Sequence, residues 1–332
     1  MKKIFLAVVA LAAMTACSND EFVSVDRAPI NFGEAFVDNA TRAADKTYGA
    51  VPLKSFNVYG TVKGKGVANP VNIFSGDLVE GTVGSSIVNG VETHVWDCEK
   101  EEYWVVGAAY NFAAVVDATV VEATKTAAGM PTQLAPKTSD NGSNFKDMLY
   151  AAASVEEATA NQGPVNFTFQ HLLSKVQFTV TSTATGSYSH SVTGIKVKNF
   201  ATGTYNIAGE TWGEATPNTD ISFGKIEDVT AASKENIGTT DEIIGKTNET
   251  QMLLIPTTKP FDVTFTVEVY RKNGENNKTL VSTETKTVTV TGKPLVKGNA
   301  YNFTIACSLN SPIKFSVTNN PTWDNEDPIT IQ

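Results

Sequence analysis

The chain has 332 residues, of which 41% are hydrophobic and 18% charged, and its formal net charge at pH 7 is −9. This length and composition can bury a sizeable core and suit two domains better than one. No basic face is visible, which argues against a nucleic-acid partner.

The N-terminus has the pattern of an export signal. Two lysines precede the apolar run Ile4 to Ala16, which is too short to span a bilayer and is typical of a signal peptide. Small residues before Cys17 resemble the cleavage site of bacterial lipoprotein signals. We therefore predict a signal peptide over residues 1–16, cleavage between Ala16 and Cys17, and lipidation of Cys17. An ordinary signal followed by an incidental cysteine is the alternative.

The segment from Val23 to Val37 carries Ile30, Phe32 and Phe36 in loose alternation, which predicts a first strand. A run of small residues around Arg42 follows it, and we interpret this run as a linker.

Further along the chain, alternation with period two predicts half-buried antiparallel strands. Phe261 to Val269 is the clearest example, and Val176, Phe178 and Val180 repeat it, as do Val288 and Val290. Many short strands with glycine-containing turns between them predict an all-β fold of sandwiches or open barrels.

Three segments have less regular patterns. Residues 118–144 predict a long loop, and Asp147 to Glu157 fits either a short helix or a strand with a turn. The stretch from Thr159 to Pro164 is typical of a domain boundary, with a new strand system from Val165.

Side chains suited to catalysis or metal binding are few. Neither His94, His171 nor His190 lies at metal-ligand spacing with another histidine, and adjacent glutamates point to opposite faces of a strand. We predict no catalytic residue, no metal and no cofactor, and hence no enzyme, although an enzyme with a carboxylate cleft stays an alternative. Cys98 and Cys307 are expected to be free thiols, with a disulfide as the alternative.

Several segments in order resemble the fimbrillin family, the shaft and tip subunits of protease-assembled pili in Bacteroides-type bacteria. The segments are FQHLLSKVQFTV (169–180), MLLIPTT (252–258), YWVVGAAYNFAAV (103–115), DMLYA (147–151), TGTYN (202–206) and VKGNAYNFTI (296–305). The resemblance covers nearly the whole chain and implies two tandem transthyretin-like β-sandwich domains. We place them at residues 43–163 and 164–332, after a propeptide at 17–42 that is removed on assembly.

The resemblance also implies a mode of assembly. An arginine-specific protease would cut between Arg42 and Ala43, which would free the chain from its lipid and from its first strand; Arg27 and Lys46 are rival sites. The tail 312–332 would then fill the vacated groove of another copy or of a related fimbrial subunit. Its donor side chains would be Ile313, Phe315, Val317, Trp323, Ile329 and Ile331. Two ordinary edge strands are the alternative for this tail.

These features predict a precursor anchored in the outer membrane by its lipid and a mature form in an extracellular fimbria that supports adhesion. A fimbrial tip or anchor subunit is one alternative. A glycan-binding surface lipoprotein is another, and it would need exposed aromatic rings, for which Trp212 and Trp323 are the loop candidates.

Overall fold

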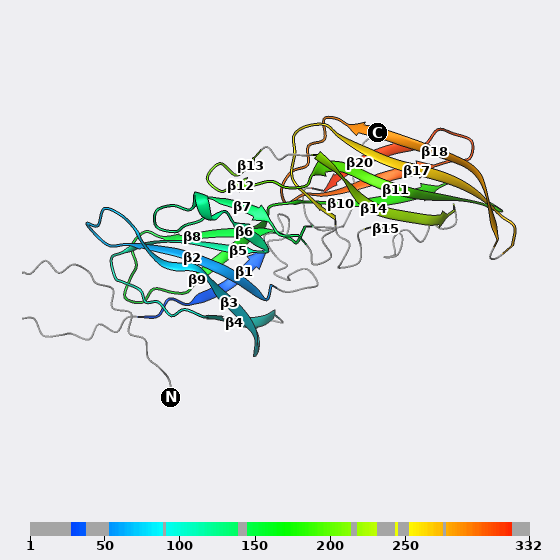
Figure 1. The fold of residues 1–332 in the computed structure, drawn as a ribbon. Helices are drawn as coiled ribbons and strands as arrows, with labels where there is room; N and C mark the ends of the chain where they lie inside the picture. Colours follow the sequence, from blue (N-terminus) through cyan, green and yellow to red (C-terminus); the bar gives the residue numbers. More distant parts are fainter. Residues whose placement is uncertain are drawn as a thin grey trace, which may run out of the picture.

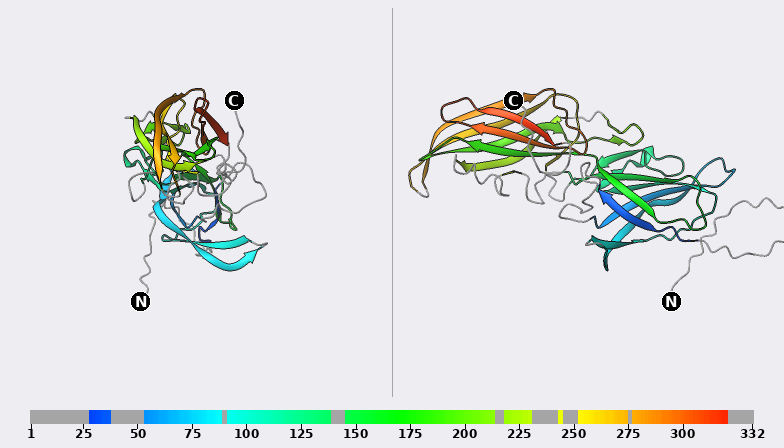
Figure 2. Two further views of the ribbon diagram at one scale, coloured as in Figure 1. Left: turned by 90° about the vertical axis from the view of Figure 1, so that its right-hand side faces the viewer. Right: turned by 180° about the vertical axis from the view of Figure 1, so that it is seen from behind.

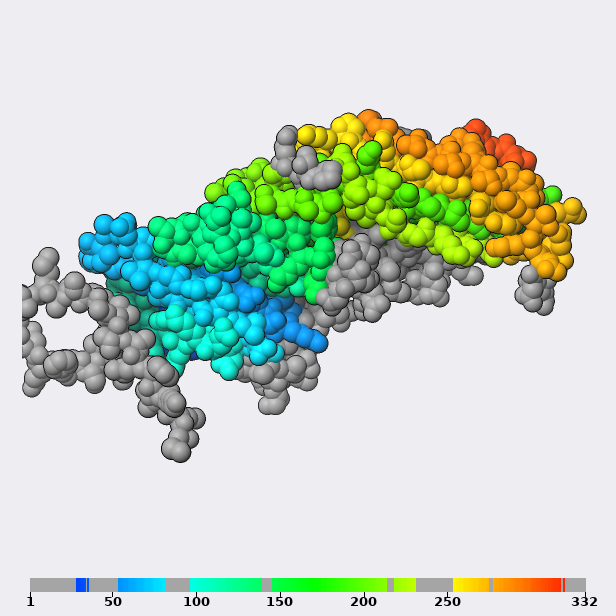
Figure 3. Space-filling view, viewed as in Figure 1, coloured from blue at the N-terminus to red at the C-terminus, as the bar shows by residue number. Residues whose placement is uncertain are grey.

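The computed structural model describes residues 28–37, 53–88, 91–138, 145–213, 218–230, 243–244, 252–274 and 277–320. Within these ranges the protein consists of strands, turns and one short 3-10 helix, η1 (Glu122–Thr124). The prediction of an all-β fold is therefore confirmed. The strands gather in two halves that lie end to end (Figure 1), and the molecule is elongated (Figure 3). No helix in the described part of the chain is long and apolar enough to cross a membrane.

The N-terminal half is built on one seven-stranded sheet. Its strands, in spatial order, are β1 (Phe32–Val37), β9 (Val165–His171), β8 (Leu149–Val155), β5 (Ala109–Val116), β2 (Ser55–Lys63), β3 (Val71–Val88) and β4 (Val91–Cys98). The edge strands β1 and β4 contact each other, so the sheet curls around a single core. Aromatic residues from almost every strand fill that core, including Phe56, Phe74, Phe112 and Phe169.

The C-terminal half is a sandwich of two sheets. One contains β15 (Ile243–Ile244), β10 (Ser174–Ser182), β19 (Ala300–Cys307) and β20 (Lys314–Asn320), with β16 (Met252–Leu254) also paired to β10. The other contains β14 (Asn218–Val229), β11 (Tyr188–Phe200), β17 (Phe261–Lys272) and β18 (Lys278–Val290). Side chains of both sheets, among them Phe178, Phe303 and Phe265, form its core.

The strand predictions for this half are confirmed. On β17 the residues Phe261, Val263, Phe265 and Val267 are buried and alternate with more exposed ones. On β10 the predicted core residues Val176, Phe178 and Val180 are buried as well. Strand β17 is the half-buried antiparallel strand that alternation predicts. Strand β10 differs from that prediction, because it is buried on both faces and runs parallel to β19.

A small third sheet joins the two halves. It contains β13 (Thr211–Trp212), β12 (Tyr205–Asn206), β7 (Gln133–Pro136) and β6 (Ala118–Val120). Because β12 lies between β11 and β14 in sequence but pairs with β7, a hairpin from the C-terminal half completes a sheet on the N-terminal half. Figure 2 shows this junction from behind.

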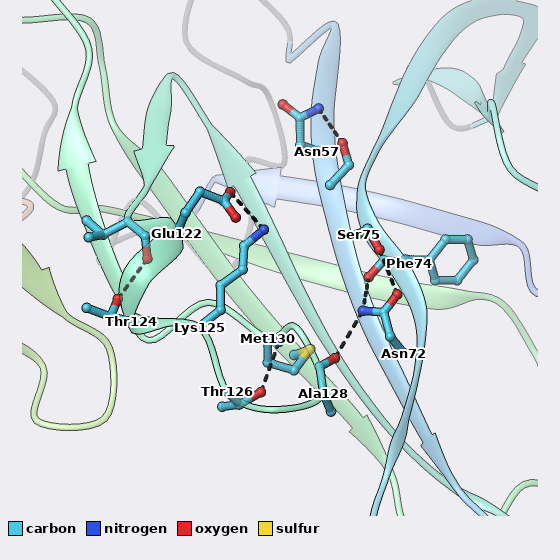
Figure 4. A network of polar contacts seen from close by, with 12 residues as sticks. Asn57, Asn72, Phe74, Ser75, Glu122, Thr124, Lys125, Thr126, Ala128 and Met130 are labelled. Carbon is cyan, nitrogen blue, oxygen red and sulfur yellow. Dashed lines mark hydrogen bonds and ion pairs between the residues drawn. The ribbon is translucent and has the colours of Figure 1, made fainter.

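Residues 118–138 are therefore not the long loop that the sequence predicts. Beyond β6, Thr124 Oγ donates to the Val121 carbonyl at 2.9 Å, and Met130 N donates to Thr126 Oγ at 3.0 Å. The side-chain amide of Asn72 ties this turn to β3 by donating to the Ala128 carbonyl at 3.1 Å (Figure 4). Strands this short carry too little alternation to be recognised in a sequence rich in Ala and Thr.

The strand from Val165 also differs from its predicted place. We placed it at the start of the second domain, whereas β9 pairs with β8 and β1 and belongs to the seven-stranded sheet. Alternation identifies a strand but not its partners, and here the chain leaves the first sheet only after His171. The ambiguous stretch before it forms strand β8 rather than a helix.

The prediction about the two cysteines has a clear outcome. Cys98 and Cys307 are free thiols, and burial raises the pKa of Cys307 to about 12. His171 is buried at the junction, where its Nδ1 lies 2.9 Å from Asp147 Oδ1.

Candidate assembly site

The first described strand, β1, occupies one edge of the seven-stranded sheet. It runs parallel to β9, with Phe32 opposite Val165, Ala35 opposite Phe167 and Val37 opposite Phe169. The register shifts between Phe32 and Ala35. A Cβ at Gly33, within this irregular stretch, would lie 2.2 Å from Asn166 Oδ1, so the residue must be small for β1 to approach β9 this closely.

The side chains of β1 are part of the core. Ile30, Phe32 and Ala35 are buried, and Phe32 is only 6% exposed. The Phe32 ring stacks on Phe167 at 6.0 Å and meets Phe56, Phe74 and Phe112 edge-on at 5.7 to 6.5 Å. The predicted strand is therefore present and fills the interior; the side chain of Phe36 lies outside the described residues.

The chain leading into β1 is held on both sides. The backbone N–H of Ile30 donates to the Glu102 carbonyl at 2.7 Å, and Trp104 N donates to the Ala28 carbonyl at 2.9 Å. On the opposite side Val165 N donates to the Asn31 carbonyl at 2.8 Å. We call the space that residues 28–37 fill the β1 slot; β9 and residues 102–104 form its walls.

Polar groups at the mouth of this slot are paired locally. Lys100 Nζ lies 2.9 Å from Glu102 Oε1, and the Tyr103 hydroxyl donates to Glu101 Oε1 at 2.7 Å. The hydrogen bond to Glu101 raises the pKa of Tyr103, which keeps the phenol neutral. These polar pairs lie over an aromatic interior, an arrangement suited to binding a peptide strand.

The last described strand, β20, lies at an edge of the C-terminal half. It is antiparallel to β19, with Phe315 opposite Ile305 and Val317 opposite Phe303. Ile313, Phe315 and Val317 are only partly buried against the core, and the Phe315 ring stacks on Phe265 at 6.0 Å. Of the predicted donor side chains, these three thus lie on their own half in the single chain.

The remaining predicted site residues lie outside the described part of the chain. These are Ala16, Cys17, Arg42, Ala43, Trp323, Ile329 and Ile331. Arg42 and Ala43 fall between β1 and β2, so they lie on the covalent connection that joins β1 to the rest of the sheet.

Chemistry outside the two edge strands is limited. No group of three or more metal-binding side chains occurs among the residues the structure describes. Ser182 Oγ lies 2.8 Å from His190 Nδ1, but both residues are buried, and burial lowers the pKa of His190. The indole of Trp212 donates to the Leu172 carbonyl at 2.9 Å and lies in the junction, which does not suit an exposed glycan platform.

Sequence reasoning missed the wall formed by residues 102–104. The segment with Tyr103 and Trp104 was noted only as one motif of the family resemblance, because nothing in its own sequence indicates pairing with residues 28–30. Pairing of this kind is set by the folded sheet and has no signal in the sequence.

The fold is that of an all-β protein in two halves, with its first described strand at a sheet edge of the N-terminal half and its last at a sheet edge of the C-terminal sandwich. A family model described as fimbrillin-like matches residues 41–321, so the chain belongs to the fimbrillin-like family. The resemblance stated from the sequence is thereby confirmed.

Several solved structures share this fold. A fimbrial protein from Bacteroides vulgatus aligns with a TM-score of 0.61 and 14% identity, covering 89% of this chain and 99% of that one. A candidate cell adhesion protein from Bacteroides uniformis has a TM-score of 0.51 and 14% identity, with coverage of 91% and 99%. A similar one from Bacteroides ovatus has a TM-score of 0.50 and 16% identity, with the same coverage. No curated protein matches this sequence.

Proposed function

We propose that this protein is a structural subunit of a cell-surface fimbria, and not an enzyme. It would be exported as a lipoprotein, held in the outer membrane through Cys17, and released by an arginine-specific protease that cuts between Arg42 and Ala43. The released chain would polymerise by donor-strand exchange with copies of itself or with related subunits, and the fimbria would support adhesion.

One observation carries this proposal. Strand β1 is integral to the core of the N-terminal half, yet its connection to the rest of that half runs through the segment that contains Arg42. A cut there leaves β1 held by non-covalent contacts alone. A cut after the rival site Arg27 would leave β1 covalently attached.

Loss of β1 would create a strong binding site for a strand. It would uncover the hydrophobic contacts of Ile30 and Phe32, each of which contributes about 1.5–3 kcal/mol when buried. It would also leave backbone groups of β9 and of residues 102–104 without partners. A replacement strand therefore has both an apolar interior and a hydrogen-bonding edge to bind.

The tail 312–332 supplies a strand of suitable composition. Its residues Ile313, Phe315 and Val317 alternate and are only partly buried on the chain's own sheet, so their transfer to a neighbour would complete their burial. Donation from one end of a chain to the other end of the next is a heterologous contact that does not close, and it yields a filament.

The proposal is tested by N-terminal sequencing of the protein on the cell surface, together with two variants. Wild-type protein in fimbriae should begin at Ala43, whereas Arg42→Ala should remain lipidated and monomeric. The matched control Arg27→Ala should assemble normally. Normal fimbriae from Arg42→Ala would contradict the proposed cleavage site, and a surface protein that still begins at lipidated Cys17 would indicate an anchor subunit instead.

A second variant tests the donor segment. A chain that lacks residues 312–332 should be exported and cleaved but should not polymerise, because it has nothing to donate. Fibres formed by this truncated chain would refute the donor assignment.

A further inference from the structure

The loop at the mouth of the β1 slot, residues 101–107, contains a buried donor without an acceptor. Trp104 is 2% exposed, and its ring packs edge-on against Tyr110 at 4.7 Å and Phe112 at 6.0 Å. Its indole N–H has no hydrogen-bond partner within the described residues. Buried donors are nearly always paired, because leaving one unpaired lowers the stability of the state that contains it.

The backbone of Trp104 lies beside the chain that leads into the strand that is proposed to leave. The backbone N–H of Trp104 donates to the Ala28 carbonyl, immediately before β1, and the carbonyl of Glu102 accepts from Ile30. Residues 28–30 thus run along the loop and give Trp104 a backbone partner, but they offer the indole no acceptor. In the single molecule, the strand that fills the slot therefore leaves one donor of the slot wall, the Trp104 indole, without an acceptor.

The same loop also exposes apolar side chains. Tyr103 is 43% exposed, Val105 44% and Val106 57%. Gly107 and Val67, which is also exposed, line a shallow pocket of about 550 Å³ between the loop and the β2–β3 turn. These residues lie at the end of the molecule away from the C-terminal half, where β1 starts. Apolar surface grouped at one place typically marks a contact with another chain.

We propose that loop 101–107 is the recognition surface for residues 321–332, the distal part of the donor tail of a second copy, and that the Trp104 indole donates to an acceptor which these residues carry. The inference rests on the proposed function and adds a specificity-determining residue to it. Replacement of β1 by the incoming strand is then favoured over the reverse exchange, because the incoming strand accepts from the indole N–H that β1 leaves unpaired.

The sequence of the segment supports this choice of occupant. Residues 321–332 contain the acceptors Asp324, Asn325, Glu326 and Asp327 between the apolar residues Trp323 and Ile329. Fully extended, the whole tail 312–332 spans roughly 70 Å, against roughly 33 Å for the ten residues of the slot. The tail is long enough to line the slot with residues 312–320 and to reach the loop with residues 321–332.

The test is Trp104→Phe in the full-length protein, which keeps an aromatic ring and removes the N–H. Two quantities are compared: the urea midpoint of the uncut precursor, and the dissociation rate of polymers formed after cleavage. The lost hydrogen bond should make polymers dissociate about tenfold faster, beyond any change in the precursor. Trp96→Phe is the control. Trp96 lies on β4 and packs on Phe56 at 5.2 Å, so this substitution should affect precursor and polymer alike.

The acceptor is identified by alanine substitution of each of the four polar tail residues in turn. One of these variants should reproduce the faster dissociation and should add nothing further when combined with Trp104→Phe. If Trp104→Phe weakens precursor and polymer equally, or if no tail variant couples to it, the inference is wrong. If the wild-type chain does not polymerise after cleavage, the fimbrial function itself fails and this inference fails with it.

Discussion

The two edge strands at the ends of the described chain differ in how they are bound. Strand β1 inserts Phe32 among the rings of the N-terminal core and pairs with β9, and the chain leading into it pairs with residues 102–104. Among the described residues, strand β20 pairs only with β19, and Ile313, Phe315 and Val317 cover the sandwich core while remaining partly exposed. One strand contributes buried side chains to its core, and the other covers its core with side chains that stay partly exposed.

This difference indicates which strand suits which role. The N-terminal half must be much less stable when its slot is empty, so that binding of a neighbour's strand is strongly favourable. The buried contacts of β1 meet that requirement. A donor must detach from its own half at modest cost, and β20 meets that one. The chain would then use a strong acceptor site and a weakly held donor, with the protease deciding when the first becomes available.

The largest expected change in stability is that caused by Phe32→Ala in the uncut precursor. Removing a ring enclosed by Phe56, Phe74, Phe112 and Phe167 should lower the free energy of unfolding of the N-terminal half by about 3–5 kcal/mol, since the surrounding sheet can collapse only partly. Urea unfolding followed by tryptophan fluorescence measures it. A loss below that of Phe315→Ala would show that β1 is not a core strand.

Phe315→Ala should have an intermediate effect. The ring stacks on Phe265 and lies 5.8 Å from Phe303, but it is half-exposed, so the expected loss is about 2 kcal/mol and is confined to the C-terminal half. The same unfolding experiment measures it. A loss as large as that of Phe32→Ala would mean that β20 is too strongly held to serve as a donor.

A smaller effect is expected at the junction between the halves. Trp212→Phe removes the indole that donates to the Leu172 carbonyl, and this should lower stability by about 1 kcal/mol and reduce the coupling between the two unfolding transitions. Calorimetry of the variant should show the transitions further apart than in the wild type. Unchanged coupling would mean that the hairpin of β12 and β13 does not transmit stability from one half to the other.

The sequence predicted the parts of this comparison that depend on local pattern. The alternation of Ile30 and Phe32 predicted β1, and the alternation of Ile313, Phe315 and Val317 predicted β20. A strand with one buried face has apolar residues at every second position, and this pattern is visible in the sequence. The parallel pairing of β1 with β9, the wall at residues 102–104 and the sheet shared by β7 and β12 could not be predicted. Each depends on segments far apart in the chain, and the residue types involved do not indicate which segment they pair with.

The smallest predicted effect concerns pH and should be confined to the C-terminal half. Burial lowers the pKa of His190 from 6.5, so the folded protein holds this imidazole neutral, with Nδ1 2.8 Å from Ser182 Oγ. When the pH falls through 6.5, the unfolded chain binds a proton that the folded chain excludes, and stability therefore decreases with acidification until the folded pKa is reached.

Replacing this histidine should remove that dependence. His190→Gln should unfold with a midpoint that changes less between about pH 7 and about pH 5 than the wild-type midpoint does, whatever its absolute stability. Phe32→Ala, measured over the same range, should keep the wild-type dependence, since it alters the other half. An equal pH dependence in wild type and His190→Gln would mean that His190 gains its proton in the folded protein as readily as in the unfolded chain, and that the C-terminal core is more open to water than its burial indicates.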